Sequence, residues 1–342
     1  MSGLFVQKHV EALRAQGCDV RVIFSQGLGD SWRQWRALRR EGWMPDVVQL
    51  NVIQKQGLLA MWLKRRYGIP YLIIEHWSGY LPENGQFMRM SGFKRRLYRH
   101  IAREASMLLT VSNRHAEAMR DCGIEAKQWG RICNVVDGFF FESTEHRAQT
   151  VLRTDRTQRT DTRKTLLHVS CFDERAKNVK GLLRAAKMLS ERRQDWKLVL
   201  VGTGVDYTEV RAFADSLDIP EGLLEWTGEL TPREVAEAFD NAAVFVLPSH
   251  YENAPVVISE SLVKGVPIVS SQVGGIPEMV DEKCGILTEP GNDEQLVEAL
   301  DTMLDHYQEY NKEVIRESGY QYSFAKVGGQ LLHIYEQVLA SK

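Results

Sequence analysis

Two glutamates in the second half of the chain have the spacing of a ligand-binding pair. Glu252 is predicted in a loop after the apolar run AVFVLPS, and Glu260 stands eight residues later in a predicted helix from Pro255 to Lys264. A carboxylate among apolar helix neighbours is costly unless donors bind it, and the vicinal diol of a ribose offers two. The helix start adds free N–H groups that suit a phosphate, with Pro255 at the first helical position. The alternative is structural: Glu260 pairs with Lys264, one turn further on, along a solvated face.

The residues around the pair come in a recognisable order. Glu252–x7–Glu260 is followed by Gly265-Val266-Pro267, Gly274-Gly275-Ile276-Pro277-Glu278, Gly285-Ile286-Leu287 and Pro290-Gly291. In this order the sequence resembles the retaining glycosyltransferases of family GT4, which have the GT-B architecture. The segments HVSCFDERAKNVKGLLRAA, GTG at 202–204 and WTGEL at 226–230 match as well. The resemblance runs from about residue 2 to the last helix.

The resemblance implies a role for each matching residue. Glu252 contacts hydroxyls of the transferred sugar, Glu260 binds the nucleotide ribose, and Lys177 binds the diphosphate. Such a leaving group needs cationic or N–H donors, because negative charge grows on it as the glycosidic bond breaks. Cys171 stands where the family usually has a second cation, and Arg175 is the nearest substitute. The backbone positions that the resemblance places at the donor are Asn253, Ala254, Val256 and Val257 beside the sugar and diphosphate, Gly202 and Gly204 beside the nucleotide, and Thr227 and Gly228 beside the base.

A histidine in the first half completes the candidate set. His76 directly follows the apolar run YLIIE, and GT4 members often carry a histidine just past this strand, facing the donor sugar. A histidine can donate a hydrogen bond to a sugar hydroxyl or a phosphate oxygen within its normal pKa range. A lone histidine is more often a structural residue, and the strand end is what favours the functional interpretation here. The NVVD run at 134–137 is assigned a structural role.

Strand and helix patterns alternate along almost the whole chain. Strands separated by single helices need crossover connections, so each half is predicted as a parallel sheet with helices on both faces. The fold class is therefore α/β, and the resemblance implies two doubly wound, Rossmann-like domains that face each other across a cleft. The predicted parts are an N-terminal domain at 1–145, a polar linker at 146–164, a nucleotide-sugar domain at 165–322 and a last helix at 323–342 that crosses back to the N-terminal domain.

The start of the chain departs from this pattern. A doubly wound domain opens with a buried strand and a glycine-bearing loop, whereas this sequence enters a helix within a few residues of Met1. We therefore expect the first strand to be missing and Gly3 to be the last glycine of its loop. The next strand is predicted at residues 18–24, from the sequence CDVRVIF.

Composition excludes several classes of protein. The 342 residues carry 43 Lys/Arg and 45 Asp/Glu and are 44% hydrophobic, which is typical of a globular protein and not of a disordered one. No apolar run has the length of a transmembrane helix, and the first residues lack a secretory signal. The five cysteines form no C-x-x-C pair, which favours reduced thiols in a cytosolic protein.

The small net charge of −2 hides an asymmetry between the halves. Residues 1–150 carry 22 Lys/Arg against 14 Asp/Glu, whereas residues 151–342 carry 21 against 31. A basic half could attract phosphate-bearing ligands, nucleic acid or an anionic membrane, or it could reflect solvated helix faces alone. Within it, the predicted helix of residues 91–104 has five Lys/Arg and an apolar side. We expect this helix to give peripheral contact with the inner membrane face, and we expect no nucleic-acid partner.

These observations predict a retaining, hexosyltransferase-like enzyme of the bacterial cytoplasm. It would move a sugar from a UDP- or GDP-sugar to a saccharide or lipid-linked acceptor, in polysaccharide or glycolipid biosynthesis, by same-face attack. No metal and no cofactor besides the donor is expected. The alternatives are another GT-B enzyme, such as a nucleotide-sugar epimerase or a phosphorylase, and a non-catalytic sugar-nucleotide-binding protein. A Rossmann dehydrogenase would need G-x-G-x-x-G after its first strand, which the sequence lacks.

Overall fold

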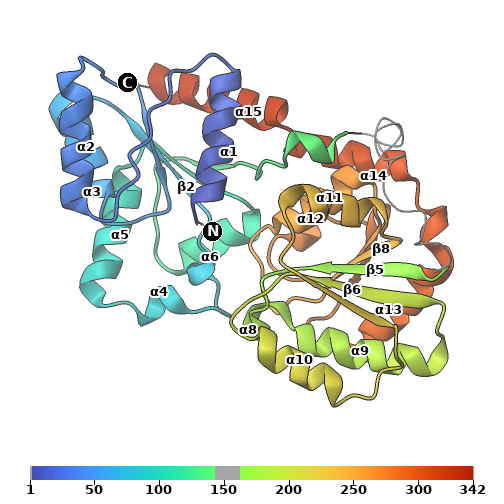
Figure 1. The fold of residues 1–342 in the computed structure, drawn as a ribbon. Coiled ribbons are helices and arrows are strands. Elements are labelled where there is room, and N and C mark those ends of the chain that lie inside the picture. The colour runs from blue at the N-terminus through green and yellow to red at the C-terminus, as the bar shows by residue number, and fades with distance from the viewer. Residues whose placement is uncertain (1, 143–161, 342) are drawn as a thin grey trace. The chain divides into compact units, whose positions relative to one another are not determined.

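The computed structural model describes residues 2–142 and 162–341, which form two compact units (Figure 1). Unit 1 comprises residues 1–135 and 324–342, and unit 2 comprises residues 136–323. The final segment of the chain therefore belongs to the same unit as its beginning. Most of the predicted linker at 146–164 lies outside the described residues.

Unit 1 is built on a parallel sheet whose strand order is β1-β2-β3-β4. Its strands are β1 (Val48–Asn51), β2 (Tyr71–Glu75), β3 (Met107–Thr110) and β4 (Trp129–Arg131). The two central strands are fully buried, as their runs of Leu and Ile require. Because all four strands are parallel, their carboxyl ends and the loops that follow them meet at one edge of the sheet.

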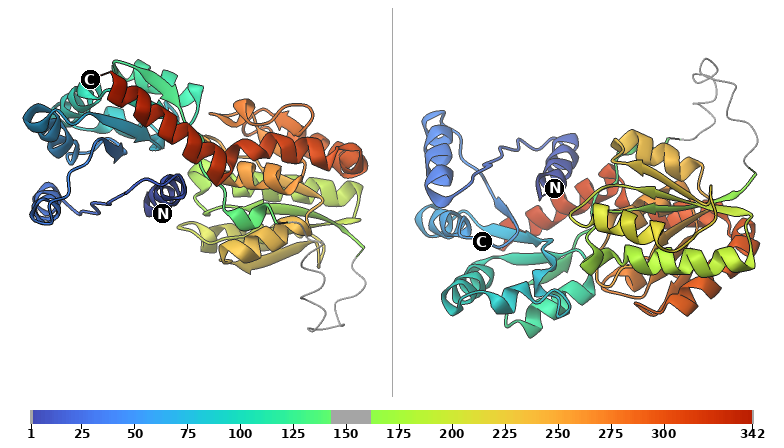
Figure 2. Two further views of the ribbon diagram at one scale, coloured as in Figure 1. Left: turned by 90° about the horizontal axis from the view of Figure 1, so that it is seen from above. Right: turned by 60° about the horizontal axis from the view of Figure 1, so that its bottom comes forward.

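Helices cover both faces of this sheet. They are α1 (Ser2–Ala15), α2 (Leu28–Arg40), α3 (Gly57–Tyr67), α4 (Gln86–Arg89), α5 (Gly92–Glu104), α6 (Asn113–Asp121) and α15 (Phe324–Ala340), with the 3-10 turn η1 (Ser78–Tyr80). α1 and α15 lie side by side although they come from opposite ends of the chain (Figure 2). At their contact, a Cβ on Gly328 would lie 2.8 Å from the carbonyl oxygen of Ala12, so only glycine permits this approach. Leu13, Leu331 and Ile334 of this pair close the core against Leu72 of β2.

The predicted strand at residues 18–24 is wrong. The segment is irregular, and Val22 and Phe24 on it are 47% and 75% exposed. The alternating apolar pattern is typical of a strand, but a strand also needs a neighbour to share its hydrogen bonds. No strand in the described part of unit 1 pairs with this segment. It is held by side chains instead, among them the amide of Gln34, which donates to the Phe24 carbonyl at 2.8 Å.

Unit 2 contains a six-stranded parallel sheet of order β10-β9-β8-β5-β6-β7. Its strands are β5 (Lys164–Val169), β6 (Trp196–Val201), β7 (Leu224–Gly228), β8 (Val244–Leu247), β9 (Ile268–Ser271) and β10 (Gly285–Thr288). From β5 the chain winds outward through β6 and β7, and it then returns to place β8 on the other side of β5. The winding direction thus reverses between β5 and β8. In open parallel sheets, ligands bind beyond the carboxyl ends of the strands at such a point.

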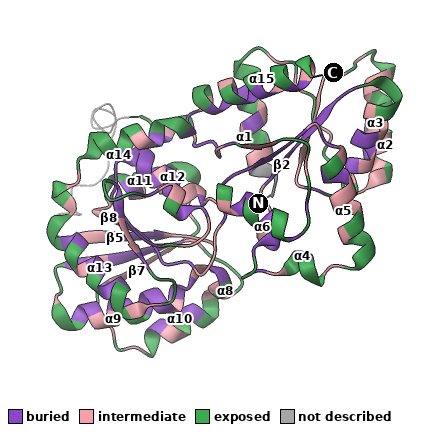
Figure 3. Cartoon of the chain, turned by 180° about the vertical axis from the view of Figure 1, so that it is seen from behind, coloured by how far each residue is buried: buried purple, intermediate pink, exposed green. Residues whose placement is uncertain are grey.

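Helices cover both faces of this second sheet as well. They are α8 (Glu174–Lys177), α9 (Val179–Arg192), α10 (Tyr207–Asp215), α11 (Pro232–Asp240), α12 (Val256–Lys264), α13 (Asp293–His306) and α14 (Lys312–Gly319). Short 3-10 turns stand between them: η2 (Gly138–Phe140), η3 (Ile276–Glu278), η4 (Tyr307–Glu309) and η5 (Tyr320–Tyr322). α9, α10 and α13 pack on one face, and α11, α12 and α14 on the other (Figure 1). The inner strands β8 and β9 and the inner sides of these helices are buried, whereas the edge strand β7 is half-buried (Figure 3).

The α/β fold class with two parallel sheets is confirmed, and the details that differ are local. Pro255 is the N-cap of α12, with φ −69° and ψ 126°, and not its first helical residue as predicted. The short elements β4, α8 and α14 were not predicted, because each is only three to eight residues long and has no clear period of its own.

Candidate functional site

The loops after β5 and β8 carry most of the predicted site residues. The loop after β5 leads into α8, which contains Arg175 and Lys177, and the loop after β8 contains Glu252 and Asn253. β5 and β8 are neighbours in the sheet, with Leu166 opposite Val244. The two loops therefore leave the sheet side by side, at the point where the winding direction reverses.

The structure brings Lys177 and Glu252 into direct contact. The Lys177 ammonium donates to Oε1 of Glu252, and the Ser249 hydroxyl donates to the same oxygen at 2.9 Å. The two charged side chains are only 16% and 11% exposed. Burial by itself would lower the pKa of Lys177, but the Glu252 carboxylate outweighs this effect and raises it. Lys177 is therefore a buried, fixed cation rather than a solvated loop lysine.

The backbone holds the two loops together around this ion pair. Asn178, whose φ of +52° is left-handed, donates from its side-chain amide to the Pro248 carbonyl at 3.1 Å. The His250 N–H donates to the Ala176 carbonyl at 2.8 Å. Beneath them, His168 on β5 contacts the Val246 carbonyl of β8 through Nδ1 at 2.9 Å. Lys177 is thus placed by hydrogen bonds of the residues on both sides of it, and Glu252 by those of residues that precede it in the loop.

The predicted glycine pair supports the Glu252 loop. Gly274 has a φ of +55°, and a Cβ there would lie 1.6 Å from the Glu252 carbonyl oxygen. The N–H of Gly275 donates to the Asn253 carbonyl at 2.8 Å. The two glycines therefore act as a platform on which the loop rests, and any side chain at the first of them would displace it.

The lysine of the structural alternative for Glu260 pairs with another residue and does not lie on a solvated face. Lys264 binds Asp240 of α11 at 2.8 Å, with the lysine side chain 3% exposed, so its charge is already compensated. Glu260 lies half-buried on α12, the helix that directly follows the Glu252 loop. Ala254, Val256 and Val257, predicted beside the donor, occupy the loop end and the first turn of this helix. First-turn N–H groups such as these have no partner within a helix and suit an anion.

Glycines after β6 and β7 let the loops that follow these two strands approach the loop after β5. Cβ atoms on Gly202 and Gly204 would lie 2.0 Å from the Ser170 carbonyl oxygen and 2.5 Å from Phe172 backbone atoms. The Gly202 N–H also donates to the Gly228 carbonyl at 2.7 Å, and Gly228 has a φ of +72°. These glycines therefore permit close packing of the loops after β5, β6 and β7. Thr227 is half-buried, and its hydroxyl donates to the Gly228 carbonyl at 3.0 Å.

Two further predicted positions, Arg175 and Cys171, differ in how far they are exposed. Arg175 is exposed on α8, two residues before Lys177. Cys171 is half-buried in the loop after β5 and is a free thiol, as are the other four cysteines. Sequence reasoning missed Ser249, whose hydroxyl binds Glu252, and His168, which links β5 to β8. Only their places beside the predicted loops could have indicated them.

His76 belongs to unit 1 and directly follows β2, as predicted. Its ring stacks on Phe5 with centroids 5.0 Å apart and lies 5.7 Å from the ring of His9. Burial, with smaller contributions from His9 and His115, lowers its pKa to about 3. The expectation of a normal pKa is therefore wrong, since His76 is neutral at pH 7 and can act only through hydrogen bonds.

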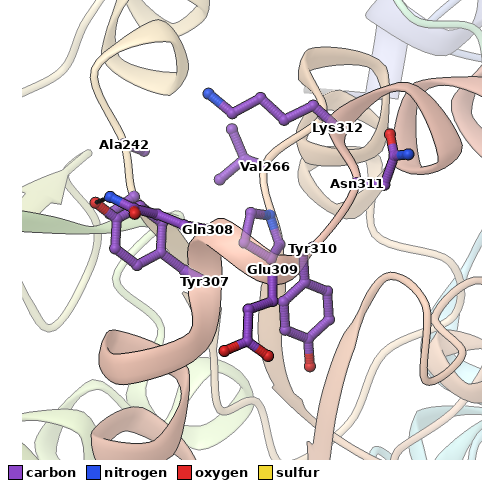
Figure 4. A pocket seen from close by; sticks show the side chains of 11 residues that line it. Ala242, Val266, Tyr307, Gln308, Glu309, Tyr310, Asn311 and Lys312 are labelled. Atoms are coloured by element: carbon purple, nitrogen blue, oxygen red, sulfur yellow. Dashed lines mark hydrogen bonds between the residues drawn. The ribbon is translucent and has the colours of Figure 1, made fainter.

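A separate hollow lies at the opposite end of the unit 2 sheet. It has a volume of about 620 Å³ and is lined by the residues before β8 and β9 and by the segment from Tyr307 to Lys312 (Figure 4). In Figure 4 the Tyr307 ring lies to the left and the Tyr310 ring to the right, both below Val266 in this view. None of the predicted site residues lines this hollow.

Comparison with protein families accounts for both units. Residues 153–320 match the model of glycosyl transferases group 1, and residues 24–134 match the model of a glycosyl transferase 4-like domain. The chain belongs to the GT4-type glycosyltransferases. A relative from this group, the MMP alpha-(1->4)-mannosyltransferase of Mycolicibacterium hassiacum, is 26% identical over 252 residues, which are 71% of this chain and 57% of that protein. The chain spans less than two thirds of the length of most of its first curated relatives.

Solved structures show the same GT-B fold. Sucrose-phosphate synthase from Thermosynechococcus elongatus superposes with a TM-score of 0.80 at 18% identity, over 100% of this chain and 94% of that one. HepE of Anabaena, in complex with UDP-glucose, has a TM-score of 0.71 at 19% identity, over 96% and 88%. In this GT4-type chain, residues 2–142 and 162–341 contain no helix of the length and apolarity needed to cross a bilayer.

Proposed function

We propose that this chain transfers a sugar from a nucleoside diphosphate sugar to a hydroxyl acceptor with retention of anomeric configuration. The observation that carries the proposal is the contact between Lys177 and Glu252 at the winding reversal of the unit 2 sheet. A fixed cation and a carboxylate, side by side, are what a diphosphate leaving group and a sugar hydroxyl each require.

The donor would be held by three kinds of group. Lys177 and the first-turn N–H groups of α12 would bind the diphosphate, where negative charge grows as the bond to the sugar breaks. The Glu260 carboxylate would accept hydrogen bonds from the ribose diol. Glu252 would accept from hydroxyls of the sugar while it stays bound to Ser249, whose hydroxyl fixes the carboxylate.

The chemistry would follow from this arrangement. We assign no carboxylate as a nucleophile, so the acceptor oxygen would attack from the face that the diphosphate leaves. The acceptor proton would pass to the departing phosphate oxygen. Lys177 is the cation that stabilises the leaving diphosphate, and His76 would donate or accept a hydrogen bond at the sugar in its neutral form.

The donor is proposed as a UDP- or GDP-sugar. HepE was solved with UDP-glucose, which supports a uridine donor. The relative named a mannosyltransferase supports a hexose as the group transferred. A role in polysaccharide or glycolipid synthesis agrees with these names and stays a prediction.

The ribose assignment is tested by calorimetric titration with UDP, GDP and ADP. Glu260→Ala should weaken binding of the preferred nucleotide by about 1.5–3 kcal/mol, because a hydrogen bond to a charged acceptor is lost. Glu221→Ala is the matched control, since Glu221 is exposed at the amino end of β7. Unchanged affinity for all three nucleotides in Glu260→Ala would contradict the assignment.

Product analysis separates transfer from the alternatives. A transferase gives a glycosylated acceptor and free nucleoside diphosphate, and slow hydrolysis in the absence of acceptor. An epimerase would invert a sugar centre without an acceptor, and a phosphorylase would require inorganic phosphate. A protein that binds the nucleotide sugar and releases no product with any acceptor would be a binding protein.

We also propose that α5 contacts anionic membrane lipids. Phe93 on this helix is 79% exposed, next to a groove of about 540 Å³ lined by Arg96, Leu97 and Arg103 among others. The buried Ile101 holds the other side of the helix in unit 1. Each Lys or Arg near an anionic surface contributes about 1 kcal/mol, and salt screens the attraction.

Co-sedimentation with phosphatidylserine-containing and neutral vesicles tests the membrane proposal. The protein should bind the anionic vesicles at low salt and release at high salt. Arg96→Glu should weaken this binding by about tenfold or more, whereas Arg40→Glu, an exposed charge reversal on α2, should retain it. Absence of binding at low salt would favour a soluble acceptor.

A further inference from the structure

A buried glutamate at the end of β2 connects two loops of unit 1. Glu75 is fully buried, and its carboxylate accepts from four uncharged donors. Oε1 accepts from the N–H groups of His76 at 3.0 Å and Trp77 at 2.9 Å. Oε2 accepts from the Ile53 N–H at 2.9 Å and from the Tyr80 hydroxyl at 3.4 Å.

These donors come from different loops at the same edge of the sheet. Ile53 belongs to the loop after β1, whereas His76, Trp77 and Tyr80 belong to the loop after β2. The Glu75 side chain therefore acts as a bridge between consecutive loops. Both loops leave the carboxyl edge of the sheet, where an α/β domain places its ligands.

The loop after β1 contains a strained residue that this bridge stabilises. Val52 has a φ of +69°, a left-handed conformation that β-branched residues rarely adopt. Its N–H donates to the Ile74 carbonyl at 2.9 Å, and the next N–H, that of Ile53, donates to Glu75. Hydrogen bonds on both sides of the strained residue thus go to the end of β2. Such strain persists only where the surroundings enforce it, and it concentrates at functional sites.

We propose that Glu75 is a positioning residue, whose carboxylate fixes the loops after β1 and β2 and thereby the orientation of His76. The part that concerns His76 in sugar transfer rests on the proposed function. The bridge between the loops stands on the hydrogen bonds alone. Glu75 itself touches no substrate in this proposal.

The groups around Glu75 are neutral at pH 7. Burial lowers the pKa of His9 on α1 and of His115 on α6 to about 4, and that of His76 to about 3. Burial also raises the pKa of Tyr80 and of Tyr98 on α5. Burial raises the pKa of the Glu75 carboxyl to about 7, against the opposing effect of its donors. The bridge therefore changes protonation near neutral pH.

The geometry predicts which bond a neutral side chain would lose. A glutamine amide at position 75, or a protonated Glu75 carboxyl, keeps one oxygen that accepts from N–H donors. Its other group, the NH2 or the OH, donates a hydrogen bond. Oε1 has two N–H donors, whereas Oε2 has one N–H and a hydroxyl that can turn and accept. The donating group will therefore occupy the Oε2 side and face Tyr80. The Ile53 hydrogen bond is lost, and those of His76 and Trp77 are kept.

Amide hydrogen exchange, measured residue by residue in the full chain, tests the bridge. In Glu75→Gln the protection factor of the Ile53 amide should fall about tenfold to a hundredfold, while those of His76 and Trp77 change far less. Glu125→Gln, an exposed site on unit 1, should change none of the three. Equal protection of Ile53 in wild type and Glu75→Gln would overturn the proposal.

A second variant keeps the test valid if Glu75→Gln folds poorly. Tyr80→Phe removes only the hydroxyl from Oε2, so the carboxylate loses one donor and the pKa of Glu75 should rise further. The titration is followed by the carboxyl ¹³C shift of Glu75. The Ile53 amide should lose protection at the same pH at which the carboxyl takes up its proton. A titration that leaves the Ile53 amide unchanged would overturn the proposal.

Turnover of UDP-glucose, UDP-N-acetylglucosamine, GDP-mannose and ADP-glucose tests the link to His76. With a donor that the wild type uses, Glu75→Gln should lower kcat about tenfold or more with KM for the donor within about twofold, because the donor is held by unit 2. Loosened loops with unchanged kcat would overturn the positioning role. If the wild type uses none of these donors, the proposed function fails, and the exchange experiment alone decides whether Glu75 bridges the loops.

Discussion

Replacing Lys177 by Met should separate the structural role of the ion pair from its role in ligand binding. The substitution keeps most of the side-chain volume and removes the charge, which leaves the Glu252 carboxylate with the Ser249 hydroxyl as its donor. Removing one partner of a fully buried pair costs about 3–5 kcal/mol. Because the two side chains are 16% and 11% exposed and one donor remains, we expect a loss of about 2–3 kcal/mol. In a domain of this size the loss lowers Tm by roughly 4–12 °C.

The same substitution should weaken nucleotide binding independently of stability. Loss of a charge-assisted hydrogen bond to the diphosphate costs about 1.5–3 kcal/mol, which is roughly a 10- to 150-fold rise in Kd. In the double variant Lys177→Met/Glu252→Gln no unpaired charge remains, so stability should recover while nucleotide affinity stays low. A stability effect that is equal in the single and double variants would contradict the ion-pair argument.

The assays are urea unfolding and calorimetric titration with UDP, GDP and ADP. Lys187→Met provides the matched control, because Lys187 forms an exposed pair with Glu191 on α9. Exposed pairs of this kind contribute about 0–1 kcal/mol, so neither stability nor affinity should change much. The reasoning is refuted if Lys177→Met binds all three nucleotides as the wild type does.

Three further outcomes are expected. Gly274→Ala places a Cβ 1.6 Å from the Glu252 carbonyl oxygen at a φ of +55°, so it should abolish transfer and destabilise unit 2 in urea unfolding. Gly138→Ala is the control, because a Cβ there faces open space and should change neither transfer nor stability. EDTA should leave turnover intact, and activity that is lost and then restored by Mg²⁺ or Mn²⁺ would show that Lys177 is not the main source of charge stabilisation. The carboxyl of Glu75 keeps its proton up to about pH 7 in the folded protein, but only up to about pH 4.5 in the unfolded one. The free energy of unfolding of the wild type, relative to that of Glu75→Gln, should therefore fall as pH rises through this window. A relative stability that rises there would contradict the burial argument.

The elements of the fold could largely be predicted from local patterns. Runs such as YLII and MLLT are short and apolar, and each is bounded by residues that end a helix or begin a turn, so β2 and β3 were expected where they lie. The segment at 18–24 has an equally clear alternation and forms no strand. Alternation records which side chains could face a core, but strand formation also needs a hydrogen-bonding neighbour that local sequence does not specify.

The candidate site was predictable in its members but not in its contacts. Order and spacing indicated Glu252 and Lys177, which are 75 residues apart in the sequence. Their pairing depends on β8 returning to lie beside β5, and this strand order is a property of the whole sheet. Ser249 and Glu75 were missed for the same reason, because a hydroxyl or carboxylate shows its function only when its partners are known.

A structure of the full chain with UDP, and with GDP and ADP in parallel, tests the central claim most directly. The account predicts that the nucleotide binds at the loops after β5 and β8 of unit 2, with the Lys177 ammonium at hydrogen-bond distance from the diphosphate. The ribose hydroxyls should lie at hydrogen-bond distance from the Glu260 carboxylate. A nucleotide bound in the hollow between Tyr307 and Tyr310, or anywhere away from Lys177 and Glu260, would contradict it.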